Sequence, residues 1–120
     1  MARTSAAERA SVDRTGDVNT VHLVGRVTSL DPPRTLPSGD VVHGVRVTVG
    51  RDARARPGVD AVDVACWSAV TRRVAGRLEV GDRVEVDGSL RRRFFRTGGA
   101  PASRYEVEAR RLRRVPGGSP

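Results

Sequence analysis

Residues 59–95 read VDAVDVACWSAVTRRVAGRLEVGDRVEVDGSLRRRFF, and the hydrophobic period changes twice within this stretch. Residues 59–67 alternate apolar and polar side chains, which predicts a strand. Residues 68–78 instead repeat apolar side chains at every fourth position, which predicts a short amphipathic helix. The period of two returns after a turn at Gly81 and Asp82, so the stretch predicts a strand, a helix and a second strand.

The predicted helix buries Val70, Val74 and Leu78, because side chains four positions apart lie on the same face. Ser68 or Thr71 is placed to cap its first turn, since a hydroxyl oxygen there accepts a hydrogen bond from a free backbone N–H. The pattern therefore describes a helix that packs one apolar side against the neighbouring strands.

Three further strands flank this stretch. Residues 19–30 and 41–52 precede it and alternate apolar with polar side chains, and residues 104–115 follow it with the same pattern. Residues 31–40 contain three prolines and a Ser-Gly pair, which indicates a loop or a loose hairpin tip between the first two strands. Valine, which favours strands, occurs 20 times in the chain, and isoleucine does not occur.

The predicted order is therefore strand, strand, strand, helix, strand, strand. This is the order of the OB-fold, an all-β, five-stranded Greek-key β-barrel with one short helix between strands 3 and 4. Gly25 and Gly88 lie inside predicted strands, and each indicates a bend or bulge of the kind that a small barrel needs at its corners.

The chain has 120 residues, which is enough for one domain. We expect a flexible N-terminal arm at residues 1–17, the OB-fold domain at residues 18–115 and a flexible C-terminal stub at residues 116–120. The first residues form no apolar signal segment, and no run approaches the roughly 20 apolar residues of a membrane span. We therefore expect a cytoplasmic protein without a membrane partner.

The charge balance favours a polyanionic partner. The chain carries 22 Arg, no Lys and 14 acidic residues, for a net charge of +8. The Arg side chain stays charged, offers a planar fork of donors and stacks on flat rings. Nucleic acid is therefore expected ahead of a membrane surface as the partner.

The sequence contains no motif for catalysis or cofactor binding. It has no P-loop, no dinucleotide-binding glycine motif and no nucleophile beside a base. His22, His43 and Cys66 lack the spacing of metal ligands, so we expect structural roles for them. A lone Cys also fits a reducing compartment. We expect a protein that is not an enzyme and that uses no cofactor and no metal ion.

Several segments together resemble bacterial single-stranded DNA-binding protein, the OB-fold SSB family. They are NTVHLVGRV in the first strand, LPSGD followed by GVRVTVGRD, the stretch over residues 59–95, and YEVEARRLRRV in the last strand. The resemblance covers about residues 19–115. Its most specific part is the spacing W-x10-L-x-x-G-D-x-V-x-V-x-G-x-L, which falls on Trp67, Leu78, Gly81, Asp82, Val84, Val86, Gly88 and Leu90.

The resemblance implies a protein that binds single-stranded DNA with little sequence preference in DNA replication, repair or recombination, at the nucleoid. It also implies a homo-oligomer, a homotetramer as in the family, with a dimer as the other possibility. No acid follows Glu108, so we expect that the acidic tip with which the family recruits replication or repair proteins is absent. That departure favours a specialised paralogue.

The aromatic positions of the family are only partly kept. Two of them fall on Trp67 and Phe95, whereas two others fall on Ala61 and Arg54. Two missing rings are expected to weaken binding, because each base that stacks contributes roughly 1–3 kcal/mol. The loss is smaller if the guanidinium of Arg54 stacks on a base, or if Phe94 and Tyr105 substitute for the missing rings.

The candidate site combines flat rings with arginines, as single-strand binding requires. The period of two places Arg91, Arg93 and Phe95 on one face of their strand, with Phe94 nearer the core unless a bulge at Gly88 shifts the register. The predicted nucleic-acid-binding residues are Trp67, Phe95, Arg46, Arg54, Arg72, Arg91, Arg93 and Arg96.

Other interpretations stay open. Trp67 and Phe95 can instead be packing residues, residues 91–93 can be a solvated face, and Asp63 on the face of Trp67 would repel phosphate. The alternative function is an OB-fold protein-interaction module of the primosome-adaptor type with weak nucleic-acid binding, and RNA binding is a third. The first strand, residues 18–28, is a candidate for edge-to-edge pairing with a second copy.

Overall fold

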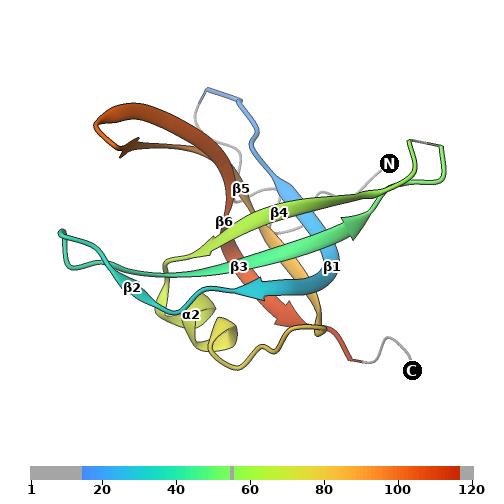
Figure 1. Ribbon diagram of the computed structural model, residues 1–120. Helices are drawn as coiled ribbons and strands as arrows, with labels where there is room; N and C mark the ends of the chain where they lie inside the picture. The colour runs from blue at the N-terminus through green and yellow to red at the C-terminus, as the bar shows by residue number, and fades with distance from the viewer. Residues whose placement is uncertain (1–14, 55, 117–120) are drawn as a thin grey trace.

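The computed structural model describes residues 15–54 and 56–116. Helix α2 (Ala69–Ala75) and a two-residue strand, β2 (Arg34–Thr35), accompany five longer strands (Figure 1). The longer strands are β1 (Val21–Leu30), β3 (Val41–Gly50), β4 (Val59–Cys66), β5 (Arg83–Thr97) and β6 (Ala100–Arg114).

Two expectations about the ends of the chain fall mostly outside this region. Of the arm expected at residues 1–17 only residues 15–17 are described, and of the stub expected at residues 116–120 only residue 116. Within the described part of the chain, no helix has the length and apolar character that a membrane crossing requires.

The five longer strands close into a barrel. Around it, the hydrogen-bonded neighbours follow the order β1, β5, β6, β4 and β3, and β3 pairs with β1 again. These pairs are antiparallel except for β4 with β6, which is parallel. This order, with α2 between the third and fourth strands of the barrel, confirms the predicted OB-fold.

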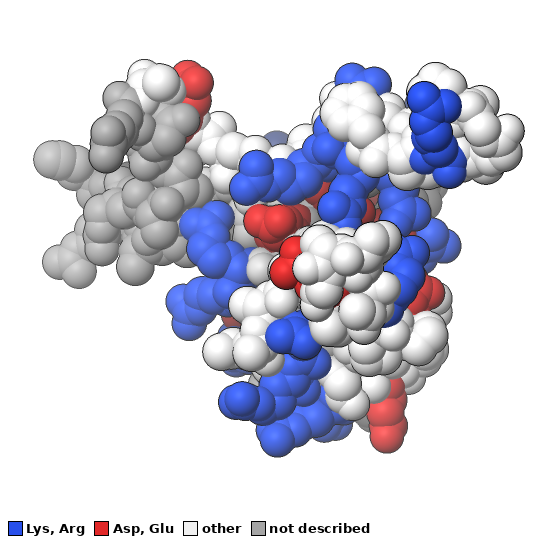
Figure 2. Space-filling view, turned by 90° about the vertical axis from the view of Figure 1, so that its left-hand side faces the viewer, with Lys and Arg blue, Asp and Glu red and all other residues white. Residues whose placement is uncertain are grey.

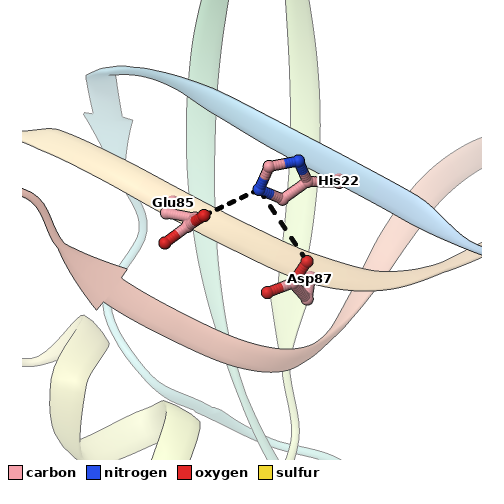
Figure 3. A group of neighbouring side chains, drawn as sticks. All are labelled: His22, Glu85 and Asp87. Atoms are coloured by element: carbon pink, nitrogen blue, oxygen red, sulfur yellow. Dashed lines mark hydrogen bonds and ion pairs between the residues drawn. The ribbon is translucent and has the colours of Figure 1, made fainter. Parts of the chain in front are cut away.

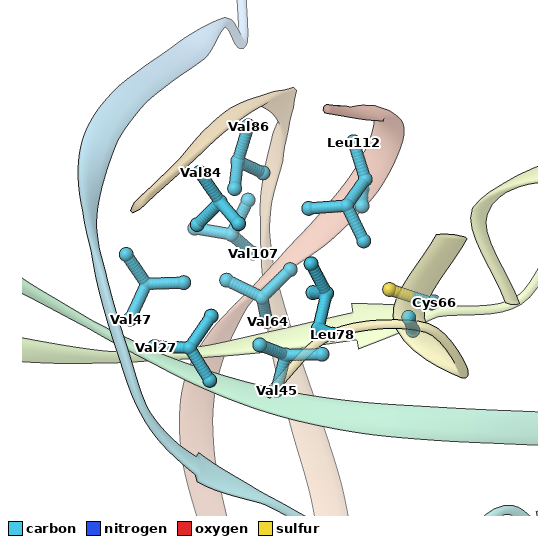
Figure 4. Close-up of a cluster of buried hydrophobic side chains, with 12 residues drawn as sticks. Val27, Val45, Val47, Val64, Cys66, Leu78, Val84, Val86, Val107 and Leu112 are labelled. Atoms are coloured by element: carbon cyan, nitrogen blue, oxygen red, sulfur yellow. The ribbon is translucent and has the colours of Figure 1, made fainter. Parts of the chain in front are cut away.

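The inward-facing valines of the strands fill the barrel (Figure 4). Val27, Val47, Val84 and Val86 are fully shielded from solvent. The branched valine side chain packs well on a pleated surface, and burying each one contributes roughly 2 kcal/mol. The alternation seen in the sequence therefore fixes which face of each strand points into the core.

Helix α2 differs from its prediction in length and in the side that it buries. Its buried residues are Thr71 and Ala75, whereas Val70 is 66% exposed, so the prediction that Val70 faces inward is wrong. The small side chains of the buried face let the helix lie close to β3, β4 and β6. Leu78 enters the core from the turn after the helix. Ser68 is the N-cap, and its Oγ accepts a hydrogen bond from the Thr71 backbone N at 3.1 Å.

Two irregularities bend the strands of the barrel. The pairing of β5 with β6 shifts between Asp87 and Gly88, which confirms an irregularity at Gly88, but the extra residue is Arg110, so the bulge lies in β6. In β1 the shift lies between Val27 and Ser29 rather than at Gly25. Gly25 instead allows β1 and β3 to approach closely, because a Cβ at this position would lie 2.5 Å from a backbone oxygen of β3.

β5 and β6 continue beyond the barrel as a long two-stranded hairpin (Figure 1). They stay paired as far as Thr97 and Ala100, and Gly98 and Gly99 form the turn with positive φ angles of 58° and 85°. Beyond Leu90 neither strand has another ladder partner among the described residues. The side chains of this extension therefore alternate between two faces, and both faces are largely exposed beyond Glu106.

Gly88 is the position in the fold least able to accept a side chain. A Cβ there would lie 2.0 Å from the carbonyl oxygen of Glu108 and 3.2 Å from Cα of Ala109. Because backbone atoms of β6 cannot move aside without breaking the β5–β6 ladder, we expect Gly88→Ala to destabilise the protein by roughly 3 kcal/mol or more in urea denaturation. Gly50→Ala is the control, since nothing lies within 4 Å of a Cβ at Gly50. Equal stability of the two variants would contradict this account.

Candidate nucleic-acid interface

A groove of about 570 Å³ crosses the outer face of the barrel. β3 and β4 form its floor, the segment around β2 borders it on one side, and the hairpin of β5 and β6 borders it on the other. β2 pairs with β3, so residues 31–40 form the loose hairpin that the sequence indicated. The charged residues that line the groove are Asp31, Arg34, Arg46, Asp63, Arg93, Arg104 and Glu106.

Trp67 lies beside this groove and is covered on one side by an arginine. The guanidinium carbon of Arg93 is 4.4 Å from the centroid of the Trp67 ring. Nε of Arg93 also lies 3.4 Å from Oε2 of Glu106, whose side chain is only 5% exposed. The ring and the carboxylate together orient the guanidinium, so ring and guanidinium form one flat surface next to the groove.

Two further arginines of the groove, Arg46 and Arg104, are also held by carboxylates. Nε of Arg46 lies 3.0 Å from Oδ1 of Asp63, which is its direct neighbour in the β3–β4 ladder. Nη2 of Arg104 lies 3.8 Å from Oε1 of Glu106. These pairs orient the guanidinium groups, but an anion that enters the groove must share or displace the carboxylates.

Acidic and basic side chains are neighbours on the surface as well. In the space-filling view, carboxylates lie among the arginines and no continuous basic field forms on the face shown (Figure 2). The net charge of +8 is therefore not concentrated into a single patch on that face.

Phe95 and Phe94 lie on opposite faces of the hairpin, and both are exposed, by 44% and 75%. The expectation that Phe94 lies nearer the core is wrong, because the hairpin has left the barrel at this point. Phe95 shares the face of Arg93, and the guanidinium carbon of Arg104 is 6.0 Å from its ring centroid. Arg91 lies on the same face, in an ion pair with a glutamate of β6.

Only two of the eight predicted residues, Arg46 and Arg93, line the groove itself, and three others lie away from it. Nε of Arg72 donates a hydrogen bond to the carbonyl oxygen of Trp67 at 3.1 Å, and this bond holds the Arg72 guanidinium group against the backbone. Nη1 of Arg96 donates to the carbonyl oxygen of Gly99 at the hairpin turn, at 2.7 Å. Arg54 is exposed in the loop between β3 and β4. The structure thus places Arg46 and Arg93 in the groove and Trp67 next to it, against Arg93. Phe95 and Arg91 lie on the adjoining hairpin face, and Arg54, Arg72 and Arg96 lie elsewhere.

Sequence reasoning missed three charged residues of the groove, Asp31, Arg34 and Glu106. Glu106 alternates in phase with Arg104 along the last strand, and residues two apart on a strand share a face, so this position could have been found. Arg34 lies in a segment without any hydrophobic period, and no sequence signal directs it to the groove.

A second cluster of charged groups joins β1 to β5 (Figure 3). Nε2 of His22 lies 2.7 Å from Oε2 of Glu85 and 4.0 Å from Oδ1 of Asp87. These donor types suit a metal ion, but Nε of Arg113 donates to the other oxygen of Glu85 at 3.1 Å. The hydrogen bonds from His22 and Arg113 lower the pKa of Glu85 below its ordinary value of 4.5. The cluster is therefore an ion-pair network between three strands, in keeping with a structural role for His22.

Cys66 and His43, the other residues for which structural roles are expected, are both buried. Burial raises the pKa of the Cys66 thiol to about 11. The thiol is therefore protonated at neutral pH, and a protonated thiol is a poor nucleophile.

Comparison with known proteins agrees with this geometry. The structure is similar to one described as "Plasmodium falciparum SSB complex with ssDNA", with a TM-score of 0.69 and 22% sequence identity, over 82% of this chain and 96% of that chain. At this identity the likeness shows the fold. No curated protein matches the chain in sequence. The model of the Single-strand binding protein family matches residues 18–115, and the chain therefore belongs to the single-strand binding protein family.

Proposed function

We propose that this protein binds single-stranded DNA with little sequence preference, and that the strand lies in the groove over β3 and β4. The observation that carries the proposal is the stack of Arg93 on Trp67 beside that groove, at 4.4 Å. Membership of the single-strand binding protein family supports it, as does the fold shared with a protein solved in complex with ssDNA.

Stacking supplies the part of the affinity that does not depend on sequence. Every base has a flat π face, so a ring or a guanidinium plane accepts any base, and each stack contributes roughly 1–3 kcal/mol. The Trp67–Arg93 pair offers one such surface at the groove, and Phe95 offers another on the adjoining hairpin face. A strand in the groove therefore meets two stacking surfaces in succession.

Arg46 contacts a phosphate by leaving its exposed carboxylate, whereas Arg93 and Arg104 keep the buried Glu106 and use their remaining N–H donors. In the free protein Arg46 faces Asp63, and Arg93 and Arg104 both face Glu106. A phosphate offers the guanidinium fork the same kind of acceptor pair as a carboxylate does. Each phosphate contact also releases counterions from the DNA, which makes binding weaker as the salt concentration rises.

Single-strand binding of this kind fits a role in DNA replication, repair or recombination. Family membership does not favour the alternative, a protein-interaction module with weak nucleic-acid binding. Contacts with replication or repair proteins, a location at the nucleoid and the absence of enzymatic activity stay predictions.

The exposed edge of β1 supports self-association. Residues 21–25 pair with β5 on one side only, and pairing with β3 on the other side begins at Arg26. Among the described residues, the second edge of this segment has no ladder partner, and an open edge is a template for another strand. We infer that two copies pair through this edge, in a dimer or as half of a homotetramer.

Trp67 is the only Trp in the chain, so its fluorescence reports on the groove. We expect oligo(dT) to quench Trp67 fluorescence by stacking beside it, and the affinity to fall at least tenfold as salt rises from about 50 to about 200 mM. Duplex DNA of the same length is the control and is expected to quench weakly. An equal response to duplex, or an affinity that does not change with salt, would refute the proposed function.

Asp63 is expected to limit the affinity. In Asp63→Asn the guanidinium of Arg46 is released for a phosphate, so oligo(dT) should bind more tightly and the slope of log affinity against log salt should become steeper by about one. Asp60→Asn is the matched control, because it releases Arg51 from an ion pair of the same 3.0 Å length that does not line the groove. Tighter binding by both variants to the same degree would place the strand outside the groove.

Self-association is tested by sedimentation of the full chain without DNA. At micromolar concentration we expect the mass of a dimer or a tetramer, because paired β1 edges bury backbone groups that a monomer leaves open. A monomer mass at this concentration would contradict pairing through β1.

A further inference from the structure

The β5–β6 hairpin has a second surface, directed away from the groove, which we call the back face. Its side chains lie on the same face of the hairpin as Val107, which points into the barrel core. Because the hairpin extends beyond the barrel, the rings of the back face are not covered by the core. Phe94 and Tyr105 are 75% and 60% exposed on this face. Adjacent large rings left in solvent mark a surface that binds something. The back face consists of Leu90, Arg92, Phe94, Arg96, Pro101, Ser103 and Tyr105.

Arg92 orders the two rings of the back face. It is opposite Tyr105 in the ladder, and Phe94 is opposite Ser103, so the four side chains form a square. The guanidinium carbon of Arg92 is 5.2 Å from the Phe94 centroid and 5.5 Å from the Tyr105 centroid. Its Nε and Nη2 donate to Oγ of Ser103 at 3.1 and 3.0 Å. Arg92 is thus held on Ser103 and lies against both rings of the back face.

The charge of the back face selects the kind of ligand. On the groove face of the hairpin Arg91, Arg93 and Arg104 are paired with glutamates. On the back face neither Arg92 nor Arg96 has an ion pair with a carboxylate of the described residues. Flat rings beside uncompensated arginines suit a ligand that is both anionic and aromatic.

We propose that the back face is a second contact surface for single-stranded DNA, so that a strand leaving the groove passes around the hairpin and stacks on Phe94 and Tyr105. The inference rests on the proposed function and extends it from one surface to two. Phe95 and Phe94 are neighbours in the chain on opposite faces, so one layer of backbone separates the two surfaces. A second copy of this chain suits the back face less well, because a symmetric contact would bring the same uncompensated arginines from both sides.

The path around the hairpin also selects for unpaired strands. Duplex DNA has a persistence length of about 150 base pairs and does not bend around an object as narrow as a two-stranded ribbon. An unpaired strand makes that turn and exposes its bases to rings on both faces. The affinity of this protein for single strands should therefore rise with length beyond the nucleotides that the groove alone holds.

The test compares labelled oligo(dT) of about 8 nucleotides, which occupies the groove, with oligo(dT) of about 30 nucleotides. The back-face variant is Phe94→Ala/Tyr105→Ala, and the groove-face variant is Phe95→Ala. We expect the back-face variant to bind the short oligonucleotide as wild type does and the long one roughly tenfold more weakly. Phe95→Ala should weaken both, and Tyr105→Phe, which keeps the ring, should bind both lengths as wild type does.

Sedimentation of each variant without DNA accompanies the binding measurements. An unchanged mass with a selective loss on the long oligonucleotide supports the second surface. The inference is overturned if the back-face variant binds both lengths as wild type does, if it loses both equally, or if its mass falls, which would make the back face an interface between copies. If wild type binds neither oligonucleotide, the proposed function itself fails; if wild type binds and only the length effect is missing, the second surface alone fails.

Discussion

β1 must pair with two different strands, and the barrel closes only because β1 bends between them. Its first half pairs with β5 and its second half with β3. The register shift between Val27 and Ser29 provides the bend, and Gly25 leaves room for a backbone oxygen of β3. A barrel closed by so few strands has a narrow interior, which valine fills without strain. The groove lies on the outer face of the barrel, and its arginines lie in strands rather than in loops.

The charged side chains of the groove are oriented before a ligand binds. Arg46 is fixed by Asp63, and Arg93 is fixed by both Trp67 and Glu106. A fixed guanidinium loses little rotamer freedom when a ligand binds, and an exposed ion pair is worth at most about 1 kcal/mol. A phosphate can therefore take the place of an exposed carboxylate such as Asp63 at a small cost. The carboxylates orient the arginines in the free protein while limiting the positive charge that other polyanions would meet.

The hairpin extends the same alternation beyond the barrel. Near the barrel, Val107 faces the core, whereas its neighbours Glu106 and Glu108 lie on the opposite face beside arginines. Further out there is no core, so both sets of side chains become surface, and each set carries a ring with an arginine: Phe95 with Arg104, and Phe94 with Arg92. The length of β5 and β6 thus turns one strand pattern into two faces suited to stacking.

The order of the strands, the place of the helix, Ser68 as one of two cap candidates and an irregularity at Gly88 could all be predicted, because the hydrophobic period and the backbone preferences of Ser and Gly act within a few residues. The ion pair of Arg46 with Asp63 could not, since it depends on the register of β3 against β4. The exposure of Phe94 depends on where the barrel ends along β5.

The side of α2 that is buried depends on the space at the end of the barrel. The small side chains of Thr71 and Ala75 are buried there, and the larger Val70 is exposed. Local periodicity assigns a side chain to a face of its own strand or helix. Only the packing of distant segments decides whether that face meets the core, a carboxylate or solvent, because burial and pairing are properties of the neighbours that the fold brings together.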